Sequence, residues 1–113
     1  MAADKVPLEV DCRTVKQRLD AGQPVVLLDC REPDEHEIVR LPEARLLPMS
    51  QLMTRVGELD DVRDQPLVVF CHHGGRSMRV ATWLRQQGFD QAQSMSGGID
   101  RWAEEFEPTW ARY

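Results

Sequence analysis

The chain has only three cysteines, and they are far apart in the sequence. Cys12, Cys30 and Cys71 form no Cys-x-x-Cys pair, which argues against a disulfide framework and favours a reducing compartment, the cytoplasm. No run of residues approaches the roughly 18 apolar residues that a membrane span requires. The first seven residues contain no apolar segment of the kind found in a secretory leader. These absences predict a protein that is not bound to a membrane.

Basic residues form no stripe or cluster along the chain, and the formal net charge is −5. This balance argues against nucleic acid as a direct ligand. It also means that local groups, rather than the overall charge, must capture any anionic substrate. With 113 residues and an ordinary hydrophobic content of 42%, residues 1–113 are expected to form a single domain around one core.

Apolar runs alternate with amphipathic segments along the chain. The runs at 25–28 and 67–70 are continuous, as is typical of strands covered on both faces. Shorter strands are expected at 8–10, 44–47 and 92–95. Helices are expected after a cap at Asp11, from Pro33, after a cap at Ser50, from Ser77 to Gly88, and over 99–106. The alternation predicts an α/β fold, with a parallel sheet and helices on both faces.

Two details of this pattern concern the middle of the chain. The short helix after Ser50 is expected to hold Leu52, Met53 and Val56 on its apolar face. Residues 60–66 are polar and end at a proline, so we expect a surface loop there.

The segment from Cys71 to Ser77, Cys-His-His-Gly-Gly-Arg-Ser, carries the clearest functional signal. It follows a buried strand and precedes a helix, so backbone N–H groups and the positive end of the helix are aimed at the Cys71 sulfur. Such surroundings lower the pKa of a thiol. Gly74 and Gly75 allow backbone angles and close approaches that a side chain would block. The sequence therefore predicts an activated Cys71 thiolate.

Three segments, in this order, resemble the rhodanese family, whose single-domain members are sulfurtransferases. They are residues 29–35 (Asp-Cys-Arg-Glu-Pro-Asp-Glu), the Cys-x-x-Gly-x-Arg pattern from Cys71 to Arg76, and residues 95–102 (Met-Ser-Gly-Gly-Ile-Asp-Arg-Trp). The resemblance covers most of the chain and implies a three-layer fold with a central parallel five-stranded sheet. One stretch departs from the family pattern: residues 39–44 (Val-Arg-Leu-Pro-Glu-Ala) stand where the family usually has Gly-His-Ile-x-Gly-Ala.

The resemblance implies that Cys71 takes the outer sulfur of thiosulfate or of a persulfide and becomes a persulfide itself. Cyanide or a thiol would then accept this sulfur, in a covalent cycle of two half-reactions. Arg76 is expected to bind the oxyanion part of the donor, and the loop from His72 to Ser77 is expected to line the substrate site. No cofactor is expected. No zinc site is expected at Cys71, His72 and His73 either, because consecutive residues of a tight loop point in different directions.

Neighbouring residues have more than one interpretation. His72 and His73 either tune the polarity of the site or only line its rim. Asp29 and Arg31 lie at the end of a strand beside the loop, where we expect a supporting ion pair or network. Cys30 is either a core residue or a resolving thiol for Cys71.

The same pattern is also compatible with other functions. Phosphatases and arsenate reductases also use cysteine–arginine loops, but those resembling this fold have five residues between the two, and this chain has four. A non-catalytic interaction module is a second alternative, although inactive relatives typically lack the cysteine. A dedicated persulfide relay to a protein thiol is a third.

Overall fold

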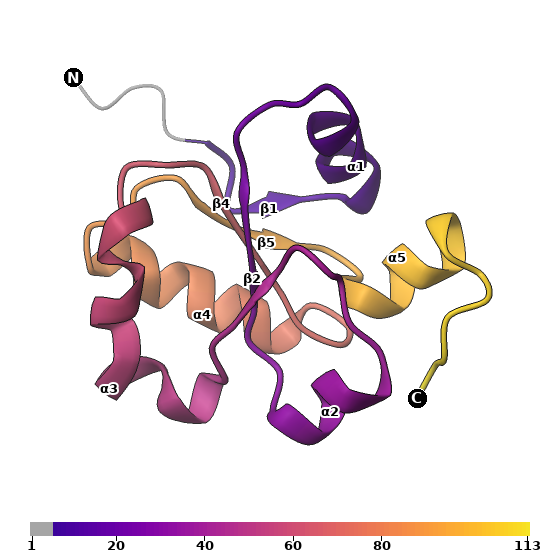
Figure 1. The fold of residues 1–113 in the computed structure, drawn as a ribbon. Coiled ribbons are helices and arrows are strands. Elements are labelled where there is room, and N and C mark those ends of the chain that lie inside the picture. The colour runs from indigo at the N-terminus through magenta and orange to yellow at the C-terminus, as the bar shows by residue number, and fades with distance from the viewer. Residues whose placement is uncertain (1–5) are drawn as a thin grey trace.

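The computed structural model describes residues 6–113 and contains a five-stranded sheet in which every pair of neighbouring strands is parallel (Figure 1). The strand order is β1-β5-β4-β2-β3. The strands are β1 (Glu9–Val10), β2 (Val26–Asp29), β3 (Arg45–Leu46), β4 (Leu67–Phe70) and β5 (Ala92–Met95). This architecture confirms the predicted fold class. The prediction that the first seven residues contain no secretory leader falls mostly on residues 1–5, which lie outside the described residues.

The helices form a layer on each face of the sheet: α1 and α5 lie on one side of it, and α3 and α4 on the other (Figure 1). None of the helices within residues 6–113 is both long and apolar enough to span a membrane. The helices are α1 (Cys12–Asp20), α2 (Pro33–Ile38), α3 (Leu52–Arg55), α4 (Gly75–Gln86) and α5 (Gly98–Phe106), with two 3₁₀ segments, η1 (Met49–Gln51) and η2 (Val56–Val62).

The strands β2 and β4 are covered on both faces, so their side chains enter two separate hydrophobic clusters. Leu28 and Val69 pack with Leu84 of α4, whereas Leu27 and Val68 pack with Trp102 of α5. All four residues of β4 are buried. Because successive side chains of a strand point to opposite faces, a strand between two helical layers must bury both sets of side chains, and in β2 and β4 nearly all of them are apolar. This requirement explains the continuous apolar runs in the sequence.

The segment between β3 and β4 differs from the prediction. Ser50 does not cap a helix; its hydroxyl donates to the Glu32 carboxylate at 2.7 Å, and α3 begins at Leu52. Met53, expected on an apolar face, is 76% exposed because the short helix α3 buries only Leu52. Residues 60–66 are not wholly a surface loop: η2 continues to Val62 and buries that side chain in the core.

An ion pair between Asp29 and Arg31 is fully buried at the end of β2. The Arg31 Nη2 donates to Asp29 Oδ2 at 2.7 Å, and its Nε donates to Oδ1 at 2.9 Å. The same guanidinium donates to the backbone carbonyl oxygens of Glu35 and Val39. Arg31 therefore attaches α2 and the following chain to the edge of the sheet where parallel strands end.

We expect Asp29→Asn to destabilise the fold by about 3–5 kcal/mol, because the substitution leaves a buried guanidinium without its counter-charge. Urea unfolding at pH 7 measures this change in the free energy of unfolding. Asp61→Asn is the matched control, since Asp61 pairs with Arg45 on the surface, and its cost is at most about 1 kcal/mol. Equal costs for the two substitutions would contradict the structural role of the buried pair.

Candidate active site

Cys71 follows β4 directly, and Cys30 follows β2 directly. Since Asp29 of β2 is paired in register with Phe70 of β4, the two cysteines occupy adjacent positions at the carboxyl edge of the sheet. Both side chains are buried, and both belong to the cluster that packs under α4. The structure thus brings together two thiols that lie far apart in the sequence.

The loop after Cys71 is held by the turn between β5 and α5. The amides of Ile99 and Asp100 donate to the carbonyl oxygens of Cys71 and His72, at 2.9 and 3.1 Å. Gly98 has a φ of +61°, and a side chain there would collide with these two carbonyl groups. Only glycine combines this backbone angle with so close an approach. The Gly-Gly pair at 97–98 therefore allows the turn before α5 to pack closely against the backbone of the Cys71 loop.

Backbone amides of the loop point at the Cys71 sulfur. The N–H groups of Gly74 and Ser77 donate to Sγ at 3.1 and 3.4 Å, and Ser77 Oγ lies 3.6 Å from it. Gly74, with a φ of +117°, is the N-cap of α4, so the helix begins at Gly75 rather than at Ser77 as predicted. The left-handed conformation of Gly74 turns the chain tightly enough to aim these amides at one atom.

These contacts produce a thiolate. Hydrogen bonding from the Cys30 side chain is the largest influence on Cys71; burial opposes it, and Ser77 and Gly74 reinforce it, so that the pKa of Cys71 falls to about 4. For Cys30 the same hydrogen bond, followed by burial, raises the pKa. Near neutral pH the pair therefore contains an anionic Cys71 and a protonated Cys30 that donates to it.

The guanidinium of Arg76 forms a bidentate ion pair with the Glu35 carboxylate of α2. The Nη1–Oε1 and Nη2–Oε2 distances are 2.6 and 2.8 Å. Hydrogen bonds from Arg76 are the main reason why the pKa of Glu35 falls to about 2. Sequence reasoning gave Glu35 no role, and the only signal for it was its place in the motif at residues 29–35.

The last residues of the chain lie against the loop, close to α2 (Figure 1). The ring of Tyr113 stacks on His72, with 3.7 Å between centroids and 7° between planes, and its hydroxyl donates to Glu35. Burial is the main cause of a lowered pKa at His72. His73 is exposed and lies 3.8 Å from Asp100. The role of Tyr113 was missed because no local pattern connects it to a loop about 40 residues earlier in the sequence.

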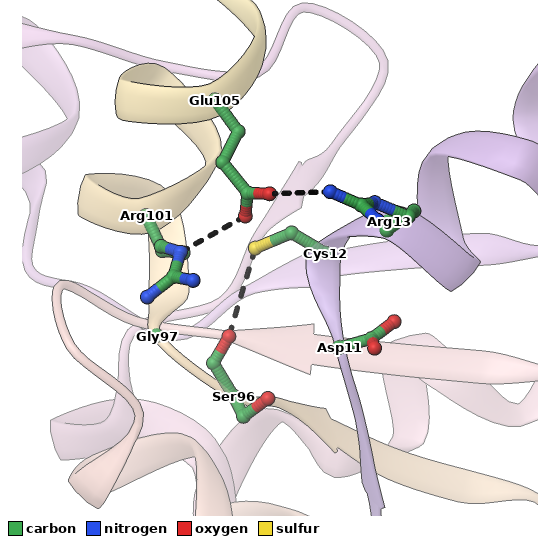
Figure 2. A pocket seen from close by; sticks show the side chains of 7 residues that line it. All are labelled: Asp11, Cys12, Arg13, Ser96, Gly97, Arg101 and Glu105. Atoms are coloured by element: carbon green, nitrogen blue, oxygen red, sulfur yellow. Dashed lines mark hydrogen bonds and ion pairs between the residues drawn. The ribbon is translucent and has the colours of Figure 1, made fainter.

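A cavity of about 420 Å³ lies beside Cys12, on the α1–α5 side of the sheet (Figure 2). Burial raises the pKa of Cys12 to about 12, so its sulfur is a neutral thiol. Figure 2 shows Arg13 and Arg101 both turned toward Glu105, with which each forms an ion pair. Within residues 6–113 no group of three or more His, Cys, Asp or Glu side chains is arranged to bind a metal ion. Of the three cysteines, Cys71 is therefore the one whose surroundings favour the thiolate.

Comparison with known proteins agrees with this geometry. Residues 11–105 match the rhodanese-like domain family. The chain is 35% identical over 95 residues to a protein of Allochromatium vinosum named sulfurtransferase, covering 84% of this chain and 87% of that one. It is 32% identical over 101 residues to a probable adenylyltransferase/sulfurtransferase, MoeZ, of Mycobacterium tuberculosis, covering 89% of this chain but only 26% of the relative.

Among solved structures, a rhodanese-related protein of Thermoplasma volcanium superposes with a TM-score of 0.79 at 28% sequence identity. The superposition covers 90% of this chain and 96% of that one. The matched family region contains both strand ends, the Cys71 loop and most of α5. The chain belongs to the rhodanese-like domain family.

Proposed function

We propose that this protein is a sulfurtransferase that moves a sulfane sulfur from thiosulfate or a persulfide to cyanide or a thiol. Cys71 carries the sulfur between the two as a persulfide. The strongest support for this proposal is the environment of the Cys71 sulfur. The sulfur accepts hydrogen bonds from two backbone N–H groups at the start of α4, and Cys71 has a pKa of about 4. A thiolate in such a cradle is both a ready nucleophile and a good holder of negative charge.

The reaction would proceed in two displacements at sulfur. In the first, the Cys71 thiolate attacks the outer sulfur of the donor, and the S–S bond of the donor breaks with its electron pair leaving on sulfite or on a thiolate. Cys71 then carries an S–S bond to a terminal sulfur. In the second, the acceptor attacks that terminal sulfur, and the electron pair of the broken bond returns to Cys71 as a thiolate. No external oxidant or reductant is needed, and because the first product leaves before the acceptor attacks, the cycle is expected to show ping-pong kinetics.

The loop would stabilise the persulfide intermediate through its backbone. The terminal sulfur of a persulfide is acidic, and its negative charge needs donors fixed in advance, such as the amides of the 72–77 loop. In better-measured oxyanion sites, the loss of one such donor costs about 2.7–4 kcal/mol in the transition state. Because the loop is held by α5 through Ile99 and Asp100, these donors need no rearrangement during the reaction.

Relatives support this chemistry and also a variant of it. The Allochromatium relative is named sulfurtransferase, which favours sulfur transfer by residues 1–113 as a single domain. MoeZ and the MOCS3 proteins of plants are named both adenylyltransferase and sulfurtransferase, and the chain covers about a quarter of their length. A relay of the Cys71 persulfide to a protein thiol is therefore our second candidate. Three free cysteines suit a reducing compartment, so we place the reaction in the cytoplasm.

Cys71→Ser is expected to abolish sulfur transfer without unfolding the protein, because serine fits the site but supplies no thiolate. Intact-protein mass after incubation with thiosulfate, and again after cyanide, measures the transfer. The native protein gains one sulfur atom on Cys71 and loses it to cyanide as thiocyanate; the variant gains none. Full activity in the variant would contradict the mechanism. Slow turnover with thiosulfate and cyanide but rapid transfer of the Cys71 sulfur to a particular protein thiol would favour the relay.

Cys30→Val is expected to raise the pKa of Cys71 above its value of about 4, because the strongest donor to the thiolate is lost. The native thiolate persists as pH falls until that pKa is reached, whereas the variant loses it at a higher pH. The rate of alkylation of Cys71 by iodoacetamide, measured against pH, reports the shift.

Two further variants control this experiment. Cys30→Ser keeps a donor beside Cys71 and is expected to preserve most of the effect. Cys12→Val removes a thiol on the opposite face of the sheet and is expected to leave the alkylation profile unchanged. An unchanged profile in Cys30→Val would show that the loop amides alone hold the charge.

A further inference from the structure

The guanidinium group of Arg76, which is expected to bind an oxyanion, is already paired with a carboxylate of the chain. Both of its terminal nitrogens donate to the two carboxylate oxygens of Glu35, in the two-pronged arrangement that an oxyanion substrate would otherwise take. The Glu35 side chain is mostly buried, at 16% exposure, and that of Arg76 is 34% exposed. An anionic donor that approaches the loop therefore meets a neutralised arginine and a fixed carboxylate.

Glu35 is held in this position by groups other than Arg76. The Glu32 amide donates to its Oε1 at 3.0 Å, as part of the capping box that begins α2. The Tyr113 hydroxyl donates to its Oε2 at 2.9 Å. With a pKa of about 2, the carboxylate stays ionised throughout the physiological range. Breaking the contact between Glu35 and Arg76 would therefore leave a charged carboxylate and a charged guanidinium without each other as partners.

Tyr113 is fixed in turn by two contacts. Its oxygen accepts a hydrogen bond from Arg31 Nη1 at 3.0 Å, and Arg31 is anchored by the buried Asp29 carboxylate. Its ring lies on His72 of the loop. A continuous series of contacts therefore runs from Asp29 through Arg31, Tyr113 and Glu35 to Arg76. We call Glu35 and Tyr113 the carboxylate clamp.

We propose that the carboxylate clamp makes the site selective for persulfide donors, R–S–SH, over thiosulfate. The proposal deepens the proposed function and rests on it. Thiosulfate leaves as sulfite, whose oxygens need the Arg76 fork and are repelled by Glu35. A persulfide with an uncharged R group leaves as a thiolate and places no oxyanion at that position. Glu35 is thus a specificity-determining residue, and Tyr113 is a positioning residue that acts through it.

The favoured half-reaction balances without another reactant. The Cys71 thiolate attacks the outer sulfur of R–S–SH, a new S–S bond forms to Cys71, and the original S–S bond breaks. The electron pair leaves on the inner sulfur as R–S⁻, and the proton stays on the transferred sulfur. The products are the Cys71 persulfide and one thiolate.

The test compares two donors with one acceptor. We measure kcat/KM for 2-hydroxyethyl persulfide and for thiosulfate, each with cyanide, and take the ratio as the selectivity. The native protein is expected to favour the persulfide. Glu35→Gln removes the charge but keeps the shape, and it is expected to lower the selectivity about tenfold or more, mainly by lowering KM for thiosulfate. Tyr113→Phe keeps the ring on His72, loses the hydroxyl, and is expected to act in the same direction by a smaller factor.

Two controls separate the clamp from general effects of charge or stability. Glu58→Gln makes the same chemical change in the exposed Arg55–Glu58 pair, and its selectivity is expected to equal that of the native protein. In Glu35→Gln/Arg76→Ala, the gain with thiosulfate is expected to disappear, because the released fork is gone. Tyr113→Phe, which removes one oxygen atom at a 39% exposed residue, keeps the test available if Glu35→Gln folds poorly.

The outcomes distinguish this inference from the proposed function. An unchanged selectivity in both Glu35→Gln and Tyr113→Phe would overturn the role of the clamp, as would a native protein that uses thiosulfate at least as well as the persulfide. In both cases sulfur transfer through Cys71 would stand. No sulfur on Cys71 by intact mass with either donor would overturn both proposals.

Discussion

A negatively charged sulfur held below the protein surface is the constraint around which this site is arranged. Cys71 is only 1% exposed, so its charge cannot be solvated by bulk water and must be met by donors from the chain. The amides of Gly74 and Ser77 each donate a hydrogen bond to the sulfur, and the protonated Cys30 has the largest effect on its pKa. The conformations of Gly74 and Gly98, and the position of Cys30 beside β4, follow from the need to place donors around one atom.

A second set of charges surrounds this centre without touching the sulfur. The buried Arg31 reaches the carboxylate of Asp29, two carbonyl groups near α2, and the Tyr113 hydroxyl, so one guanidinium links the sheet edge, α2 and the end of the chain. Arg76 approaches from α4 and meets α2 through Glu35. Cations and carboxylates thus alternate around the loop. In a protein with net charge −5, these ion pairs leave the groups around the loop locally close to neutral.

The sequence predicts the features that depend on short-range pattern. The structure contains the strands predicted from the apolar runs of β2 and β4 and the predicted Asp11 cap of α1. Each of these features depends on residues that are close together in the sequence, so a local pattern is enough to predict it. The Cys71 loop was predicted from its glycines for the same reason. Glu35, Tyr113 and the protonation of Cys30 were not predicted, since each depends on a contact between distant segments. Met53 was wrongly expected on the apolar face of its helix, because apolar spacing cannot show how short α3 would be.

The order of the strands has a consequence for when this chemistry can begin. Glu9 of β1 pairs with Ser94 of β5, and the Cys71 loop is held by the amides of Ile99 and Asp100. Such pairings between distant segments close late, because loop entropy must be lost before they form. Because the chain is synthesised from its N-terminus, Cys71 also leaves the ribosome before Ile99 and Asp100, which hold its loop. Before those contacts form, Cys71 lacks the ordered donors that lower its pKa, so its acidity belongs to the folded domain and not to the loop sequence alone.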